Sequence, residues 1–228
     1  MSSRRRGASV IAEQAFGPDR ALMLHHFPSA LRPAIVALWA IDEAMWAAIA
    51  AASQPALAGI KLAWWREALA RLDHDPAPPE PRLRAVADHI VSRGVSGSDV
   101  AGIEEGWAAL LDPVPDADRV LLRGQRLFAI EARLLSVEDP LLPKAGSLFA
   151  LGDAMRRRLG DFGQARQALL GDLRGRRVGR AARPVTLAAR LAARDLAEPE
   201  GTPGRALALL GHRFHGRITG ADYPARRE

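Results

Sequence analysis

The sequence predicts an all-α protein, built as a single-domain helical bundle. Apolar residues recur at helical spacing along nearly the whole chain, and no stretch shows the alternation and β-branched enrichment of a strand. Alanine and leucine, two strong helix formers, dominate a composition that is 48% hydrophobic and 25% charged. The 228 residues can bury a substantial core. We expect one domain over residues 1–228, with flexible ends at 1–7 and 220–228.

The apolar periodicity predicts helices at residues 8–16, 20–26, 31–52, 57–72, 82–92, 98–111, 116–136, 141–159, 162–173, 185–196 and 203–215. Pro28, Pro33 and Pro55 bracket the first long helix, because proline is tolerated in the first turn of a helix but not in its interior. Residues 73–81 contain four prolines, which predicts a surface loop. Serine and aspartate side chains in 96–99 and 112–116 are expected to cap the helices that follow.

Composition excludes several classes of protein. Cysteine is absent, so disulfide scaffolds and thiolate metal sites are excluded. Glu13 and Gln14 interrupt the apolar stretch after the N-terminal arginines, which makes a poor secretion signal and favours a cytoplasmic location, with the inner face of a membrane as an alternative. The longest apolar tract, 34–52, is long enough to cross a bilayer. Asp42 and Glu43 at its middle favour a core helix instead.

Positive charge is concentrated in one part of the chain. The net charge is +6, yet between Arg156 and Arg183 nine arginines face only Asp161 and Asp172, a local net charge of +7. Such a run could bind an anionic membrane surface or a diphosphate, since arginine matches phosphate oxygens, or it could be a solvated helical face. Phe162 is the single aromatic residue there, so nucleic acid is not an expected partner.

Two helices carry a pattern of tryptophans. The 31–52 helix contains Ala37-Leu38-Trp39-Ala40-Ile41-Asp42-Glu43-Ala44-Met45-Trp46, and the 57–72 helix contains Ile60-Lys61-Leu62-Ala63-Trp64-Trp65-Arg66-Glu67. Both segments resemble the squalene/phytoene synthase family. The resemblance covers residues 20–72 and continues as a looser helical match over 116–173. It implies a bundle of the isoprenoid synthase type with a central cavity.

The resemblance also implies where catalytic groups would lie. Enzymes of this family join two prenyl diphosphates head to head and use an aspartate-rich motif on each of two helices to hold magnesium against the diphosphate. Alignment of the first motif places its aspartates at Trp46, Ala47 and Ala50, none of which can bind a metal. Asp42 and Glu43 lie one turn too early, which displaces a ligand by about 6 Å along the helix.

The second motif is reduced as well. Residues 146–158 contain a single acid, Asp153, with arginines near the expected aspartates. Loss of ligands from both helices removes the site that would ionise the diphosphate. We therefore predict a catalytically degenerate member of the family, a binding or assembly module without a cofactor or bound metal. The short chain is similar to the branch that contains a mitochondrial assembly factor of respiratory complex I.

The enzymatic alternative is an active prenyltransferase with relocated ligands. Asp42, Glu43 and Asp153 would then hold one magnesium ion, while arginines replace the second metal site. The surroundings of Trp46, Glu43 and Asp153 distinguish the two hypotheses. A converging acidic pocket favours catalysis, whereas a packed aromatic plug favours a scaffold. A third hypothesis is a peripheral membrane protein that uses the arginines from Arg156 to Arg183.

A prenyl diphosphate or lipid ligand, or a protein partner, would meet a small set of candidate residues. These are Trp39, Glu43, Trp46, Lys61, Trp65, Arg66 and Arg156. The first three share one helical face, where the tryptophans either line or fill the cavity and the carboxylate needs a partner or a raised pKa. Trp65 belongs to an apolar stripe that also suits the core, and Lys61 and Arg66 either approach an anion or remain solvated. His212 and His215 lack a third ligand, so no metal is predicted there.

Overall fold

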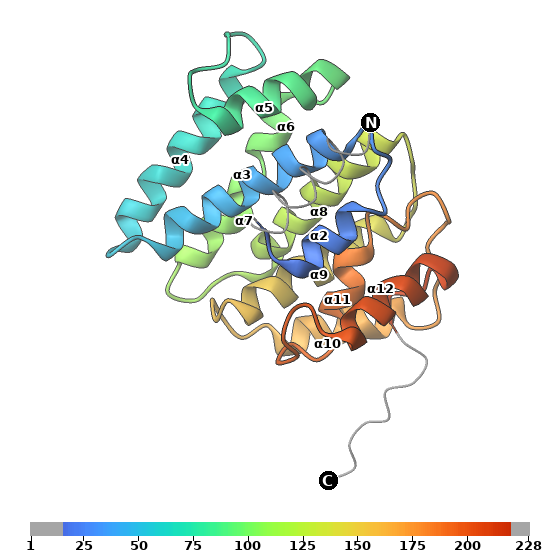
Figure 1. The fold of residues 1–228 in the computed structure, drawn as a ribbon. Helices are drawn as coiled ribbons and strands as arrows, with labels where there is room; N and C mark the ends of the chain where they lie inside the picture. The colour runs from blue at the N-terminus through green and yellow to red at the C-terminus, as the bar shows by residue number, and fades with distance from the viewer. Residues whose placement is uncertain (1–15, 220–228) are drawn as a thin grey trace.

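The computed structural model describes residues 16–219, and this part of the chain is helical without any strand (Figure 1). The predicted all-α class is confirmed. The helices are α2 (Pro18–Leu24), α3 (Arg32–Ala50), α4 (Pro55–Arg71), α5 (Pro81–His89), η1 (Val91–Arg93), α6 (Gly97–Ala101), α7 (Glu104–Ala108), η2 (Ala109–Leu111), α8 (Ala117–Leu135), α9 (Leu142–Arg156), α10 (Gly163–Leu173), α11 (Leu187–Ala192) and α12 (Pro203–His215). The helix expected at 8–16, except for its last residue, and the ends expected to be flexible lie outside the described residues.

Helix α3 lies at the centre of the molecule. Figure 1 shows α4, α5 and α6 gathered at one end, and α10, α11 and α12 at the other. Pro33 stands in the first turn of α3, where a missing N–H costs no hydrogen bond, and Ile35, Leu38 and Met45 are buried along its length. By length and hydropathy α3 is the one described helix that could cross a membrane. It is mostly buried against other helices, as expected of a core helix.

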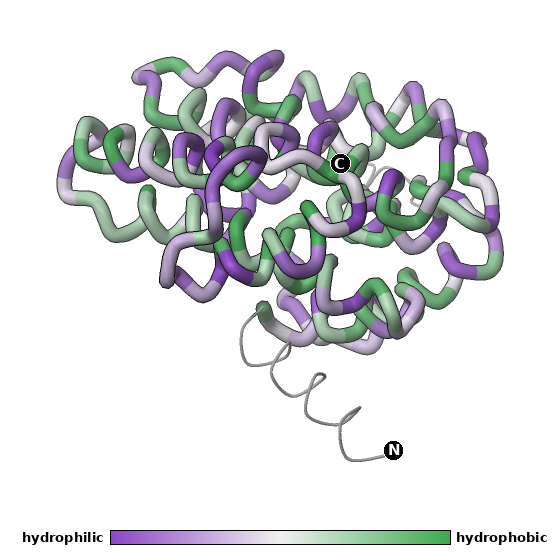
Figure 2. Tube along the Cα trace, turned by 90° about the horizontal axis from the view of Figure 1, so that it is seen from above, coloured by the Kyte–Doolittle hydropathy of each residue, from purple (hydrophilic) through white to green (hydrophobic). Residues whose placement is uncertain are grey.

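Helices α8 and α9 form the closest helix pair in the core. A Cβ atom added to Gly124 would overlap the carbonyl oxygen of Gly146, and the reverse also holds, so the two backbones touch. Phe128 of α8 and Phe149 of α9 stack beside this contact with ring centroids 5.7 Å apart. Figure 2 shows apolar and polar residues alternating along most helices, as expected where each helix buries one face.

The structure divides two predicted helices and confirms two caps. The helix predicted at 82–92 ends at His89 as α5, and a 3-10 turn, η1, follows it. Residues 98–111 were predicted as one helix, but the chain forms α6, α7 and η2 in succession, with Gly102 at the first break. Glycine destabilises a helix interior, and the two pieces differ in their main neighbour, since α6 packs mostly on α4 and α7 packs mostly on α8. The Ser96 hydroxyl accepts from Asp99 N, and the Asp116 carboxylate accepts from Asp118 N, as the predicted caps require.

Candidate functional site

Asp42 is a buried carboxylate at the centre of an ion-pair network. Its Oδ1 accepts from Arg123 Nε at 2.7 Å and from Trp107 Nε1 at 2.9 Å, and its Oδ2 accepts from Arg123 Nη2 at 2.7 Å and from Arg20 Nη2 at 3.3 Å. The side chains of Asp42 and Arg123 are each 1% exposed. Helices α3, α7, α8 and α2 each supply one group, so the contact exists only in the folded chain.

Two further acids complete the network. Asp153 Oδ2, on α9, lies 2.8 Å from Arg123 Nη1 and accepts from Arg157 Nε at 3.0 Å. Arg157 Nη2 donates to Glu43 Oε1 at 2.7 Å, and Arg20 Nη1 lies 3.0 Å from the same oxygen. We call these six residues the acid–arginine cluster: Asp42, Glu43 and Asp153 with Arg20, Arg123 and Arg157. Three negative charges face three positive charges.

Aromatic rings cover one side of the acid–arginine cluster. The Arg123 guanidinium lies 3.8 Å from the ring centroid of Trp107, and the Arg157 guanidinium lies 4.7 Å from that of Trp46. The two rings stack with centroids 6.0 Å apart. Guanidinium groups favour aromatic faces, so the tryptophans hold the arginines in place as well as excluding water. The predicted face of α3 therefore carries a packed aromatic plug.

The pKa values of Asp42, Asp153 and Arg123 are shifted so that these groups keep their charges. Burial raises the pKa of Asp42, but the charge and hydrogen bonds of Arg123, followed by Arg20 and Arg157, outweigh burial and lower it to about 2. Burial likewise raises the pKa of Asp153, and Arg123 and Arg157 bring it below its usual range. Burial lowers the pKa of Arg123. The charges and hydrogen bonds of Asp42 and Asp153 have the larger combined effect, so the pKa of Arg123 lies above its usual value. Asp42 and Asp153 stay ionised because arginines supply the opposite charge.

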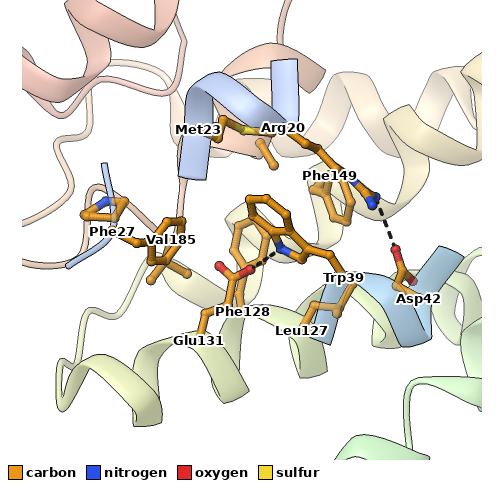
Figure 3. Close-up of a pocket in the computed structure, with 12 residues that line it drawn as sticks. Arg20, Met23, Phe27, Trp39, Asp42, Leu127, Phe128, Glu131, Phe149 and Val185 are labelled. Atoms are coloured by element: carbon orange, nitrogen blue, oxygen red, sulfur yellow. Dashed lines mark hydrogen bonds and ion pairs between the residues drawn. The ribbon is translucent and has the colours of Figure 1, made fainter. Parts of the chain in front are cut away.

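Glu131 is buried close to this network, and no arginine within residues 16–219 forms an ion pair with it. Its Oε1 accepts from Trp39 Nε1 at 2.8 Å, and both side chains line a small cavity of about 20 Å³ (Figure 3). Burial is the main cause that raises the pKa of Glu131 to about 8, against the opposing effects of Trp39 and Arg20. The carboxyl is therefore neutral near pH 7. A cavity of this size has room for about one water molecule.

A second cavity, of about 90 Å³, lies between α2, α3, α9, α11 and α12. Four residues of the acid–arginine cluster line it: Arg20, Glu43, Asp153 and Arg157. Its wall includes Arg156, whose Nη2 lies 3.5 Å from Glu200 Oε1, and Arg205, whose Nε donates to Asp19 Oδ2 at 2.6 Å. Arg156 Nη1 and Arg205 Nη1 are buried and have no hydrogen-bond partner among the described residues. A polar cavity of this volume accommodates water that can accept from these nitrogens.

The structure brings some candidate residues together and separates others. Trp39, Glu43 and Trp46 lie at or beside the acid–arginine cluster with Asp42 and Asp153, and Arg156 lines the neighbouring cavity. Lys61, Trp65 and Arg66 lie on α4 and contact none of these groups. Trp65 is buried, Lys61 is exposed beside a groove between α3 and α4, and Arg66 Nη1 lies 3.6 Å from Glu104 Oε2. The candidates therefore do not form one site.

The arginine run divides into structural and solvent-exposed members. Arg157 belongs to the cluster, Arg166 donates to the carbonyls of Ala192 and Arg194, and Arg183 donates to those of Arg213 and Phe214. The exposed members are Arg158, Arg174, Arg176, Arg177 and Arg180. A continuous basic face from Arg156 to Arg183 does not exist.

Sequence reasoning missed the arginines that pair with the acids, and also Trp107 and Glu131. Arg123 had a signal: it occupies the apolar stripe of α8 between Val120 and Leu127, where an unpaired cation would be costly. Arg20 and Arg157 had no such signal in the sequence, because each has polar or charged residues beside it. Their role depends on which helices meet.

The arrangement is poorly suited to a divalent cation. Asp42, Glu43 and Asp153 do converge, but arginine nitrogens occupy their oxygens, and no three His, Cys, Asp or Glu side chains within residues 16–219 are grouped to share a metal ion. Magnesium would have to displace at least one guanidinium from its carboxylates. The residues present do not fit that ion.

The comparisons with known proteins identify no relative. No protein family profile, no curated protein and no solved structure matches this chain.

Proposed function

We propose that this chain is a non-catalytic binding or assembly module that retains a squalene/phytoene synthase-like helical scaffold. The observation that carries the proposal is the acid–arginine cluster itself, in which each of the three acids contacts two of the three arginines and no acid lacks a cation. In an active synthase, the carboxylates of two facing helices are neutralised by magnesium. In this chain, α3 and α9 supply facing carboxylates, and arginines neutralise them.

The space around the cluster supports the same proposal. The cavity lined by Trp39 and Glu131 has a volume of about 20 Å³, and the cavity lined by Glu43 and Asp153 has a volume of about 90 Å³. Both are well below the roughly 300–1,000 Å³ of small-molecule pockets, so neither holds a prenyl chain. Trp46 and Trp107 stack over the arginines on another side. We infer that side chains fill the central cavity of an isoprenoid synthase-type bundle, which leaves the outer surfaces of the helices as the binding surfaces for a protein partner.

Incubation of the purified chain with magnesium and farnesyl or geranylgeranyl diphosphate tests the proposal. We expect no release of pyrophosphate above that of buffer, because no open carboxylate pair receives the metal. Magnesium-dependent release would contradict a scaffold role.

A binding measurement complements the assay. Thermal unfolding with increasing MgCl₂ should leave the midpoint of the unaltered chain unchanged. In Arg157→Ala, Glu43 and Asp153 lose their shared cation, so magnesium should raise the midpoint through mass action on the folded state. Arg158→Ala removes an exposed charge next to it and is the matched control. Magnesium stabilisation of the unaltered chain would show that the site already accepts the metal.

The enzymatic alternative rests on one observation, the convergence of the three acids at Arg157 and Arg123. If the chain turns over a prenyl diphosphate, these carboxylates are the groups that hold its magnesium. Asp42→Asn and Glu43→Gln would then each abolish turnover. Turnover that survives both substitutions would exclude this mechanism.

A further inference from the structure

Helix α12 exposes a row of large apolar side chains on its outer surface. Leu207, Leu210 and Phe214 follow an i, i+3, i+7 spacing and are 68%, 48% and 68% exposed. Gly211 lies in the same row, and a Cβ atom added there would meet nothing within 4 Å. The opposite side of the helix buries Leu209 and other residues, so the helix is anchored. We call this exposed row the α12 face. Contiguous exposed apolar surface of this kind typically marks an interaction site.

An arginine-rich loop is fixed beside the C-terminal end of the α12 face. Val178 N donates to Gly216 O at 2.8 Å, Arg183 Nη1 donates to Phe214 O at 2.9 Å, and Arg183 Nη1 also reaches Arg213 O at 3.0 Å. We call residues 174–180 the basic segment; its exposed members are Arg174, Arg176, Arg177 and Arg180. The backbone contacts hold these cations next to Phe214.

The surface has little negative charge to neutralise these arginines. Residues 173–194 and 201–219 contain no aspartate or glutamate. Two nearby acids are already engaged: Asp172 pairs with Lys144, and Asp139 accepts from Gly179 N at 2.7 Å. Asp172 also interacts with the charge of Arg176, but within residues 16–219 no acid forms an ion pair with the arginines of the basic segment. The segment therefore keeps a net positive charge, which attracts an anionic surface.

We propose that the α12 face and the basic segment together dock on an anionic lipid bilayer. The apolar row would enter the boundary between headgroups and acyl chains, and the arginines would contact lipid phosphates and carboxylates. A bilayer satisfies both halves of the surface at once. Nucleic acid would use the arginines but gain nothing from Leu207 and Leu210. The surface lies at the opposite end of the molecule from α4 (Figure 1).

Flotation of the full chain with lipid vesicles tests the proposal. Vesicles of phosphatidylcholine mixed with phosphatidylserine should carry the protein at low salt, and vesicles of phosphatidylcholine alone should carry much less. High salt should release it, because screening weakens the attraction of the arginines to the surface. Leu207→Ser/Phe214→Ser should lower the partition coefficient by roughly tenfold, since these side chains insert. Arg176→Ala/Arg177→Ala should lower it by a similar factor.

Matched controls come from other exposed positions. Ile60→Ser/Trp64→Ser removes a similar apolar row on α4, where the exposed fractions are 68% and 46%, and Arg71→Ala/Arg84→Ala removes two other exposed arginines. Neither control should change the partition coefficient.

Two outcomes would overturn the proposal. One is an equal effect of the control pairs and the test pairs, and the other is failure of the unaltered chain to bind anionic vesicles. A concentration-dependent dimer that Phe214→Ser abolishes, without vesicle binding, would assign the face to a second copy. The scaffold proposal concerns a remote cluster and stands or fails separately.

Discussion

Arg123 holds Asp42 by two parallel hydrogen bonds of 2.7 Å, from Nε to Oδ1 and from Nη2 to Oδ2, across 81 residues of sequence. This two-point contact matches the fork of the guanidinium to the carboxylate. Trp107 lies against the same arginine and donates to the same acid. The pair therefore joins α3, α7 and α8 at a position without access to bulk water, and stability should depend on keeping both charges.

Removal of one partner should be costly. Arg123→Met leaves Asp42 ionised, buried and short of two hydrogen bonds, so we expect a loss of about 3–5 kcal/mol in the free energy of unfolding, measured by urea denaturation. Arg119→Met, on the same helix, breaks the exposed pair with Asp112 and should cost only about 0–1 kcal/mol. Equal losses for the two substitutions would show that the buried pair has no special role.

The contact between α8 and α9 makes a steric prediction. Gly124→Ala would push a methyl group into the backbone of Gly146, so the helices must separate, at a cost of about 1–3 kcal/mol in unfolding free energy. Gly171→Ala, in α10, meets no atom and should stabilise the chain by about 0.5–1 kcal/mol. Thermal unfolding of both variants gives the comparison. A stabilising Gly124→Ala would mean that the helices are not in contact.

Glu131 should make the protein less stable at alkaline pH. Its folded-state pKa, raised mainly by burial to about 8, exceeds that of the unfolded chain, so the folded state binds the proton more tightly. The associated stability is present below about pH 4.5 and declines as pH rises through 8. Glu131→Gln has no proton to lose and should flatten this decline, which amounts to a few kcal/mol, on the order of 1.4 kcal/mol per pKa unit. Urea denaturation at several pH values measures it. Parallel pH profiles would contradict the prediction.

His212 should make the protein less stable at acidic pH, the opposite of the effect of Glu131. It is buried between α11 and α12, where Nδ1 lies 2.9 Å from Arg217 O and Nε2 lies 2.8 Å from Thr186 Oγ1. Because a carbonyl only accepts, Nδ1 carries the proton and Nε2 accepts from the hydroxyl.

Burial, aided by the charges of Arg190 and Arg183, lowers the pKa of His212 to about 4. The stability it contributes is present above pH 6.5 and is lost as pH falls toward 4. We expect the stability of the unaltered chain to fall more steeply than that of His212→Gln between these values, by up to about 3 kcal/mol. Unfolding free energies measured from pH 7 to pH 4 test this. A steeper fall in the variant would reverse the sign and contradict the assignment.

The sequence by itself determined the local structure of this protein. Prolines at the starts of α3 and α4, the capping side chains Ser96 and Asp116, and the apolar periodicity predicted the class and most helices, because these signals act between residues close in the chain. Helix α12 was predicted with its observed ends. The break at Gly102 was missed, since it accompanies a change of main neighbour from α4 to α8 that only the folded chain shows.

The partners of the acids were decided by the tertiary structure alone. Asp42 in an apolar helix signalled the need for a cation, but several arginines could have supplied one. Only the packing of α8 on α3 and α9 selects Arg123, and only the return of α9 brings Arg157 to Glu43. The same holds for the α12 face, since its helical spacing predicts an apolar row but not which side is covered. Ion pairs and exposure depend on which surfaces meet, and that is a property of the folded chain.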